Sequence, residues 1–292
     1  MSRITLVMAG NEEGGLEKHV VELAEGLVQQ GLSVSLIAHP KYQARLSSHI
    51  NFIAVDLAKS RRNPFVLYEL YQAIKTLKPD IVHVHGNKAA AMVGSLLKWL
   101  KIASVSTLHS RKKSVKMFSP YDCVIAVSQY AAENLQHPCV RVVHNGVQLP
   151  NNINPTQKVI QHEVPQVLAI GRLVDVKGFD LLIKAWKGIS AQLLIAGEGD
   201  EYAMLDELIV TEGLQDKVTL LGHRTDVLEL LQQSDLHVIS SHYEGGPYTL
   251  AESLLMHTPV VSTRVGIAPD FIPAEFLCGA GSVKELHDTL IH

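Results

Sequence analysis

The sequence predicts an α/β protein with two domains, each built on a doubly wound parallel sheet. Short apolar stretches alternate with stretches of helical periodicity along most of the chain, which is typical of parallel strands connected by helices. A polar segment near the middle interrupts this alternation, which then restarts. The 292 residues are 47% hydrophobic, 19% charged and only 5% aromatic. Such an aliphatic composition suits strands that are buried on both faces.

In the N-terminal half, residues 4–10 (ITLVMAG) form the first expected strand, and residues 14–31 the first expected helix. Gly31 marks the end of this helix. Apolar side chains share one stripe of it at helical spacing: Leu16, Val20, Leu23, Ala24, Leu27 and Val28. A further helix is expected over residues 129–136. Further strands are expected over residues 33–39, 80–86, 104–109, 123–128 and 140–146.

The polar segment over residues 147–166 carries three prolines and three asparagines, a composition typical of a linker. We therefore predict a Rossmann-like domain over residues 1–150, a linker over residues 151–165 and a second Rossmann-like domain over residues 166–292. Ligands of such folds bind at the carboxyl ends of the strands, and the expected site lies between the domains. The second domain is expected to have strands over residues 167–172, 191–199, 218–223, 236–241 and 259–263, and helices over residues 178–186, 201–213, 226–233 and 250–257.

Charge and cysteine content narrow the class of protein. A formal net charge of −3 gives no sign of a nucleic-acid partner. Cys123, Cys139 and Cys278 are far apart in the sequence, so we expect neither a structural zinc site nor a disulfide, and free thiols suit a reducing cytosol. No signal peptide and no membrane-spanning stretch are predicted, which favours a cytoplasmic protein.

The stretch SHYEGGPYTLAESLLMHTPVV, residues 241–261, places Glu244 directly after an expected strand. Glu252 follows eight positions later, within an expected helix. Thr249 is placed to cap that helix, and taken alone Glu252 fits a capping box. Glu244 by itself fits a solvated loop residue as well as a ligand-binding residue.

The pattern E-G-x-P-x-x-x-x-E followed by PVVST resembles the retaining nucleotide-sugar glycosyltransferases of the GT-B fold, the group 1 family. The resemblance implies that Glu244 contacts the donor sugar and Glu252 the ribose. It also implies that backbone groups of Gly246, Tyr248 and Thr249 contact the donor. Carboxylates suit these roles because they accept paired hydrogen bonds from neighbouring hydroxyls.

Other parts of the chain resemble the same family. GRLVDVKG places Arg172 and Lys177 after a strand, where the resemblance implies cations that stabilise the leaving diphosphate. It further implies that Gly15 and Gly222 border the donor and that His109 lies near the reacting sugar, although a structural role for His109 stays open. Gly14 belongs to the same first loop, where Glu12 and Glu13 are candidates for contacts with acceptor hydroxyls. The turns around Gly197–Gly199 and Asn145–Val147 also match the family.

No metal cofactor is expected. The sequence lacks an Asp-x-Asp at a strand end of the kind that holds a divalent ion against a diphosphate, and the resemblance implies cationic side chains in its place. His83 and His85 alternate on one strand, but no third ligand stands at a suitable spacing.

A basic stretch over residues 88–116 contains Lys88, Lys98, Lys101, Arg111, Lys112, Lys113 and Lys116. An ordinary solvated face and contact with an anionic membrane, at its cytoplasmic side, both remain open.

The expected activity is transfer of a sugar, with retention of configuration, from a nucleotide-diphosphate sugar to a glycan or glycolipid acceptor. UDP-sugars are favoured only because they are common donors, and synthesis of cell-envelope polysaccharide or lipopolysaccharide is the expected setting. The chain ends with residues 282–292, earlier than the family pattern implies. A truncated, non-catalytic nucleotide-sugar-binding relative therefore stays open, as does a nucleotide-sugar epimerase.

Overall fold

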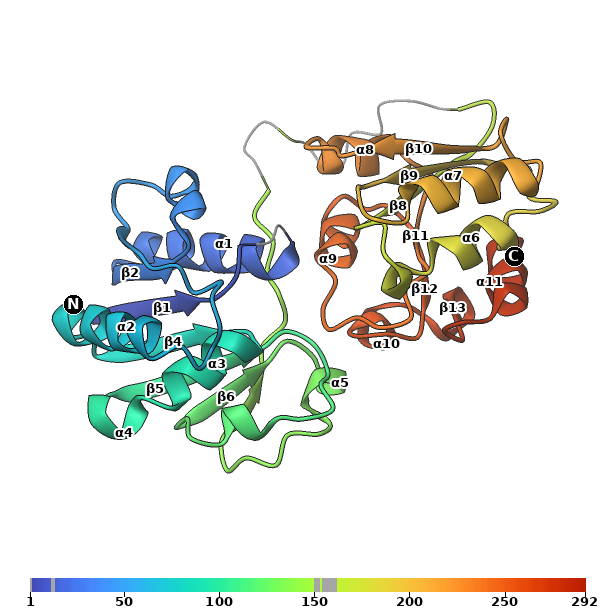
Figure 1. Cartoon of the computed structure of the whole chain (residues 1–292). Helices are drawn as coiled ribbons and strands as arrows, with labels where there is room; N and C mark the ends of the chain where they lie inside the picture. The colour runs from blue at the N-terminus through green and yellow to red at the C-terminus, as the bar shows by residue number, and fades with distance from the viewer. Residues whose placement is uncertain (1, 12–13, 150–152, 154–161) are drawn as a thin grey trace. The chain divides into compact units, whose positions relative to one another are not determined.

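The computed structural model describes residues 2–11, 14–149, 153 and 162–292. Two compact units divide the chain, unit 1 over Met1–Asn145 and unit 2 over Gly146–His292. Figure 1 shows that each unit is a sheet with helices on its faces. Most of the predicted linker over residues 151–165 lies outside the described residues.

Within the described residues, unit 1 holds one parallel sheet of seven strands in the order β3-β2-β1-β4-β5-β6-β7. The strands are β1 (Arg3–Met8), β2 (Ser33–Ala38), β3 (Asn51–Ala54), β4 (Ile81–His85), β5 (Ala103–Leu108), β6 (Cys123–Ala126) and β7 (Val140–Val142). The α-helices are α1 (Gly15–Gln29), α2 (Pro64–Leu77), α3 (Asn87–Gly94), α4 (Leu97–Leu100) and α5 (Gln129–Ala132), and the 3₁₀ turns are η1 (Pro40–Arg45) and η2 (Lys116–Phe118).

Successive side chains of β1 point to opposite faces of the sheet, and each face packs against its own helices. Leu6 and Met8 belong to the core beneath α1, together with Val20 and Ala24 of that helix. Val7 points to the opposite face, where α2 and α3 cover the second core. The predicted apolar stripe of α1 is therefore confirmed, because its members either are buried in the first core or pack against it.

The expected elements did not include β3 or α2. β3 has four residues and pairs only with β2 among the described strands, so the sequence carries little signal for it. α2 has a clear physical start: the Asn63 side chain accepts hydrogen bonds from the backbone of Phe65 and Val66 at 3.0 and 3.4 Å, and Pro64 occupies the first helical position.

Within the described residues, unit 2 holds a parallel sheet of six strands in the order β10-β9-β8-β11-β12-β13. The strands are β8 (Gln166–Ile170), β9 (Gln192–Ala196), β10 (Val218–Gly222), β11 (Leu236–Ile239), β12 (Val260–Thr263) and β13 (Leu277–Cys278). The helices are α6 (Phe179–Ala185), α7 (Tyr202–Thr211), α8 (Val227–Gln233), α9 (Tyr248–Leu255), α10 (Ala268–Phe271) and α11 (Val283–Leu290), with 3₁₀ turns η3 (Asp175–Lys177) and η4 (Ala274–Phe276).

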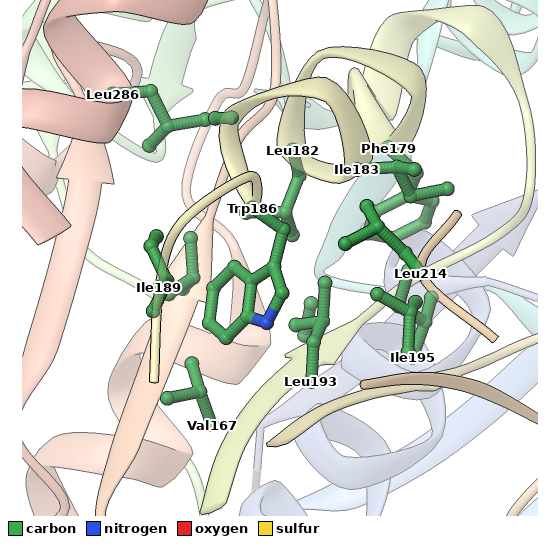
Figure 2. Close-up of a cluster of buried hydrophobic side chains, with 14 of the residues drawn as sticks. Val167, Phe179, Leu182, Ile183, Trp186, Ile189, Leu193, Ile195, Leu214 and Leu286 are labelled. Carbon is green, nitrogen blue, oxygen red and sulfur yellow. The ribbon is translucent and has the colours of Figure 1, made fainter. Parts of the chain in front are cut away.

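The core of unit 2 surrounds Trp186, which follows α6 and is fully buried. Figure 2 shows its indole ring among Leu182, Ile189 and Leu193. The indole N–H donates a hydrogen bond to the Ala191 carbonyl at 3.1 Å, so burial leaves its polar atom satisfied. Side chains of α6, α7 and α11 share this core and fix the sheet that carries the loops described below.

The expectation that all three cysteines are free thiols is wrong for two of them. Cys123 and Cys139 form a disulfide with Cα atoms 4.8 Å apart, while Cys278 is free and buried. Strands β6 and β7 pair in parallel with Val124 opposite Val140, and this register brings the two preceding cysteines side by side. Sequence spacing alone does not reveal this pairing, and its presence removes the thiol argument for a reducing compartment.

No helix in the part of the chain that the structure describes combines the length and the apolar character needed to cross a membrane.

Candidate active site

The centre of the candidate site in unit 2 is a direct contact between Lys177 and Glu244. The Lys177 ammonium donates to Glu244 Oε1 at 2.5 Å, and the Ser241 hydroxyl donates to the same oxygen at 2.8 Å. The two charged side chains are 21% and 13% exposed, so the pair is largely shielded while still open to a ligand. The structure thus brings together a predicted leaving-group cation and a predicted sugar-binding acid that lie 67 positions apart in the chain.

Neighbouring parallel strands explain why these two residues meet. Lys177 ends the 3₁₀ turn after β8, and Glu244 lies in the loop after β11. β8 and β11 pair in parallel, so their carboxyl ends share one edge of the sheet. The loop after β11 is also tied to the end of β12, because the Thr263 hydroxyl donates to the Ser241 carbonyl at 2.7 Å.

Backbone contacts hold the Lys177 loop against the Glu244 loop. The Ser240 hydroxyl donates to the Lys177 carbonyl at 2.9 Å, and the His242 N–H donates to the Val176 carbonyl at 2.8 Å. Gly178 makes this approach possible: it has a φ of +61°, and a Cβ at this position would lie 2.4 Å from the Ser240 carbonyl oxygen. The close approach of the Lys177 loop to the Glu244 loop therefore requires a glycine at residue 178.

The other predicted donor residues of unit 2 lie along the same loops. Arg172 is exposed in the turn after β8, and Gly246 belongs to the loop after β11. Glu252 is only 3% exposed and Tyr248 is buried, both within α9. Ser253 beside Glu252 bonds the buried ring of His237 at 2.7 Å, which fixes α9 against β11.

The prediction that Thr249 caps this helix is wrong. α9 begins at Tyr248 with Pro247 as the N-cap, and no side chain caps it. Glu252 is therefore the fifth helical residue rather than the third, and the capping-box interpretation of this acid no longer holds. Pro247 has an extended backbone, with φ of −63° and ψ of 126°, and the helix begins directly after it, two residues earlier than predicted.

Gly222 ends β10, and its carbonyl accepts a hydrogen bond from the Gly197 N–H at 2.8 Å. Gly197 itself approaches the loop that carries Arg172 so closely that a Cβ would lie 1.8 Å from the Gly171 carbonyl oxygen. The Gly197–Gly199 turn is predicted to border the nucleotide. Its close approach to the neighbouring backbone gives a structural reason for a glycine at residue 197.

In unit 1 the predicted Gly15 is exposed at the first position of α1, next to the N-cap Gly14. Glu12 and Glu13, candidates for acceptor contacts, lie outside the described residues. His109 follows directly after β5, as predicted, and its Nε2 lies 3.3 Å from Nδ1 of His85 at the end of β4.

A histidine that the sequence analysis missed completes this cluster. His19 lies on α1, with its ring centroid 4.8 Å from that of His109 and 5.3 Å from that of His85. Its place three residues after Leu16 and four before Leu23, at the border of the apolar stripe, is the signal that could have revealed it. Burial lowers the pKa of His109 to about 3 and the pKa of His19 to about 4, so both rings are neutral at physiological pH.

Two cations of the basic stretch over residues 88–116 have polar partners within unit 1. Lys88 donates to the Ala58 carbonyl at 2.6 Å, and Arg111 pairs with Glu133 at 3.0 Å. The Trp99 side chain is 57% exposed. The remaining cations of the stretch are exposed: Lys98, Lys101, Lys112, Lys113 and Lys116.

Known proteins are similar to this chain over nearly its whole length. The family model described as Glycosyltransferase Family 4 matches residues 13–150, and the model described as Glycosyl transferases group 1 matches residues 151–292. An uncharacterized glycosyltransferase of Methanocaldococcus jannaschii is 28% identical, over 90% of this chain and 80% of that protein. The lipopolysaccharide core biosynthesis glycosyltransferase LpsE of Rhizobium meliloti is 25% identical, over 87% of this chain and 76% of its own length.

Among solved structures, the crystal structure of HepE from Anabaena in complex with UDP-glucose matches with a TM-score of 0.83. The match covers 100% of this chain and 89% of that chain at 19% sequence identity, a similarity that shows a shared fold. The two parallel-sheet units described above are thus those of the GT-B fold, as predicted. Because the two family models together span residues 13–292, the chain belongs to the group 1 glycosyltransferases.

Proposed function

We propose that this glycosyltransferase moves a sugar from a nucleotide-diphosphate sugar, with UDP-sugars favoured, to a hydroxyl of a glycan or glycolipid, with retention of configuration. The observation that carries the proposal is the contact of Lys177 with Glu244 where β8 and β11 end. Such a site offers a cation for phosphate and a carboxylate for sugar hydroxyls within one hydrogen bond of each other. HepE, which shares the fold, is described in complex with UDP-glucose.

The proposed reaction breaks the bond between the anomeric carbon and the phosphate oxygen and forms a bond from that carbon to the acceptor oxygen. Negative charge then grows on the departing diphosphate. Lys177, with Arg172 in the same loop, stabilises this charge, while Glu244 orients the sugar through its hydroxyls. The departing phosphate oxygen takes the proton of the acceptor hydroxyl on the same face of the sugar. No side chain is assigned as a nucleophile, and no metal ion is assigned to this reaction.

The remaining donor contacts are proposals of the same kind. Glu252 would bind the ribose, and backbone groups of Gly246, Tyr248 and Thr249 would contact the diphosphate. Gly15 and Gly222 would border the donor. His109 would lie near the reacting sugar, where its neutral ring can exchange a hydrogen bond with a hydroxyl.

A thermal-shift screen against UDP-, GDP- and ADP-sugars, followed by product analysis with the donor that stabilises the protein, tests this function. We expect one nucleotide class to raise the melting temperature and a glycoside of retained configuration to form. Stabilisation by a donor without turnover toward any glycan or glycolipid would favour the non-catalytic relative. Conversion of the donor sugar into its epimer would favour an epimerase.

The setting we propose is synthesis of cell-envelope polysaccharide or lipopolysaccharide at the cytoplasmic face of a membrane. The name of LpsE, a lipopolysaccharide core glycosyltransferase, supports this proposal. Exposed Trp99 and the five exposed lysines between residues 98 and 116 provide an aromatic side chain and positive charge for an anionic lipid surface.

Vesicle sedimentation tests the membrane contact. We expect the protein to pellet with vesicles that contain anionic lipid, and to stay in the supernatant with neutral vesicles or at high salt, because exposed charges are screened by salt. Charge reversal at Lys112 and Lys113, which are exposed, should weaken pelleting. Equal recovery in the supernatant with both kinds of vesicle would reject the contact.

A further inference from the structure

Two kinds of contact join helix α9 to strand β11 in unit 2. Val238 of β11 points into the main core of the unit, so its neighbours His237 and Ile239 point to the other face of the sheet. On that face Ile239 shares an apolar cluster with Leu250 of α9. His237 is fully buried and meets the hydroxyl of Ser253 in the same helix. One contact is therefore apolar and the other is polar.

The polar contact is a relay of two hydrogen bonds. The Ser253 hydroxyl donates to the Thr249 carbonyl at 2.7 Å, and Nδ1 of His237 lies 2.7 Å from the same hydroxyl oxygen. Because a hydroxyl has only one proton to donate, the ring donates from Nδ1 to Ser253. The other ring nitrogen, Nε2, is buried and has no hydrogen-bond partner within the described part of the chain. An unpaired lone pair is tolerated there more readily than an unpaired N–H, which favours the same tautomer.

The His237 ring also stays neutral, so the direction of this relay does not change near physiological pH. Burial, and to a smaller extent the charge of Lys177, lowers the pKa of His237 to about 3. A neutral ring with its proton on Nδ1 is a donor to Ser253 at any pH well above that value. The relay is thus a permanent part of the folded unit.

The relay reaches the part of α9 that the proposed function uses. Thr249 is the second residue of α9, and Glu252 directly precedes Ser253. His237 stands in the strand whose following loop carries Glu244. The relay therefore ties the residue proposed for the ribose and the residue proposed for the sugar to the same strand.

Apolar packing alone does not fix how α9 sits on the sheet, because the hydrophobic effect has no preferred direction. A small slip of the helix would keep Ile239 and Leu250 in contact and still move the Glu252 carboxylate away from a bound ribose. Hydrogen bonds depend steeply on distance and angle, so the link from His237 to Ser253 permits one arrangement of the helix.

We propose that His237, acting through Ser253, is a positioning residue that holds α9 in the arrangement needed to bind the nucleotide part of the donor. The inference rests on the proposed function, because it takes α9 to be part of the donor site. His237 itself makes no contact with substrate and takes no part in breaking or forming a bond. Its loss should therefore raise the KM for the donor and leave kcat nearly unchanged, as expected when binding alone is weakened.

Calorimetric titration of the full chain with UDP, GDP and ADP tests the proposal. We expect at least one of them to bind the parent protein, and His237→Leu and Ser253→Ala each to raise its Kd by about 10-fold, the usual effect of one hydrogen bond. His237→Asn keeps an N–H donor near the position of Nδ1 and should recover most of the affinity. Initial rates with the matching sugar donor separate KM from kcat.

A double variant with His237→Leu and Ser253→Ala distinguishes positioning from stability. Each single change leaves a buried polar partner behind and should lower the melting temperature, whereas removal of both partners should restore part of it. The Kd of the double variant should stay raised, by no more than the larger single effect, because the two residues act in one relay.

Thr258→Val is the matched control. The Thr258 hydroxyl is buried in the same unit and donates to the Leu231 carbonyl at 2.8 Å, so its loss should lower the melting temperature without changing the Kd. An unchanged Kd in both single variants would overturn the proposal and leave the proposed function intact. So would Kd values that follow the melting temperature across all variants, the control included. A parent protein that binds none of the three nucleotides would contradict the proposed function together with this proposal.

Discussion

Lys177→Ala and Glu244→Ala should each abolish sugar transfer in practice, with kcat reduced by about 10²–10³-fold or more, while the fold is kept. The reason is that a fixed charge aimed at a developing charge acts where water is largely excluded and needs no reorganisation during the reaction. The two side chains are only 21% and 13% exposed, which meets that condition. The measurement is initial rate with the donor found in the thermal-shift screen, with unfolding followed in parallel.

Lys184→Ala is the matched control for this prediction. Lys184 lies in the same unit and also pairs with an acid, Asp180 at 3.0 Å, but on the exposed surface of α6. Surface pairs of this kind contribute little to stability, so this variant should keep both activity and fold. The assignment fails if the Lys177 and Glu244 variants turn over the donor as fast as the parent enzyme does.

Gly178→Ala should lower the free energy of unfolding by about 3 kcal/mol, because it combines a left-handed backbone with a steric collision. The new Cβ would lie 2.4 Å from the Ser240 carbonyl oxygen, which cannot move without displacing the loop that carries Glu244. Transfer should therefore fall together with stability. Urea unfolding of the whole chain, followed by circular dichroism, measures the first effect.

Gly213→Ala separates the collision from the backbone strain. Gly213 has a φ of +66°, close to the +61° of Gly178, but an added Cβ there meets no atom within 4 Å. Its cost should be about 1 kcal/mol, the cost of the left-handed conformation alone. Equal losses in the two variants would show that the tight approach of the two loops does not contribute to stability.

The sequence allowed a correct prediction of the fold class because the periodicity of each segment is local. The stripe of α1 shows this, since spacing alone identified the side chains that meet the sheet. Glu244 and Lys177 could be placed at strand ends for the same reason, and the parallel order of β8 and β11 then brings them into contact. Whether the predicted donor residues act in transfer stays a prediction.

The features that the sequence did not reveal depend on tertiary pairing. The Cys123–Cys139 bond follows from the register of β6 and β7, and the ring contact of His19 with His109 joins α1 to the residue that follows β5. The start of α9 depends on a smaller effect, because Pro247 competes with Thr249 for the N-cap position. Helix ends commonly differ by one or two residues, yet this two-residue shift changes the interpretation of Glu252.

The burial of Trp186 in the core of unit 2 also gives each unit its own optical signal. The chain contains two tryptophans, and the other, Trp99, is 57% exposed in unit 1. Fluorescence from Trp186 should therefore be emitted at shorter wavelength than fluorescence from Trp99, and should shift to the red only when unit 2 opens. A Trp99→Phe protein would report the melting of unit 2 alone, without separating the two halves of the chain.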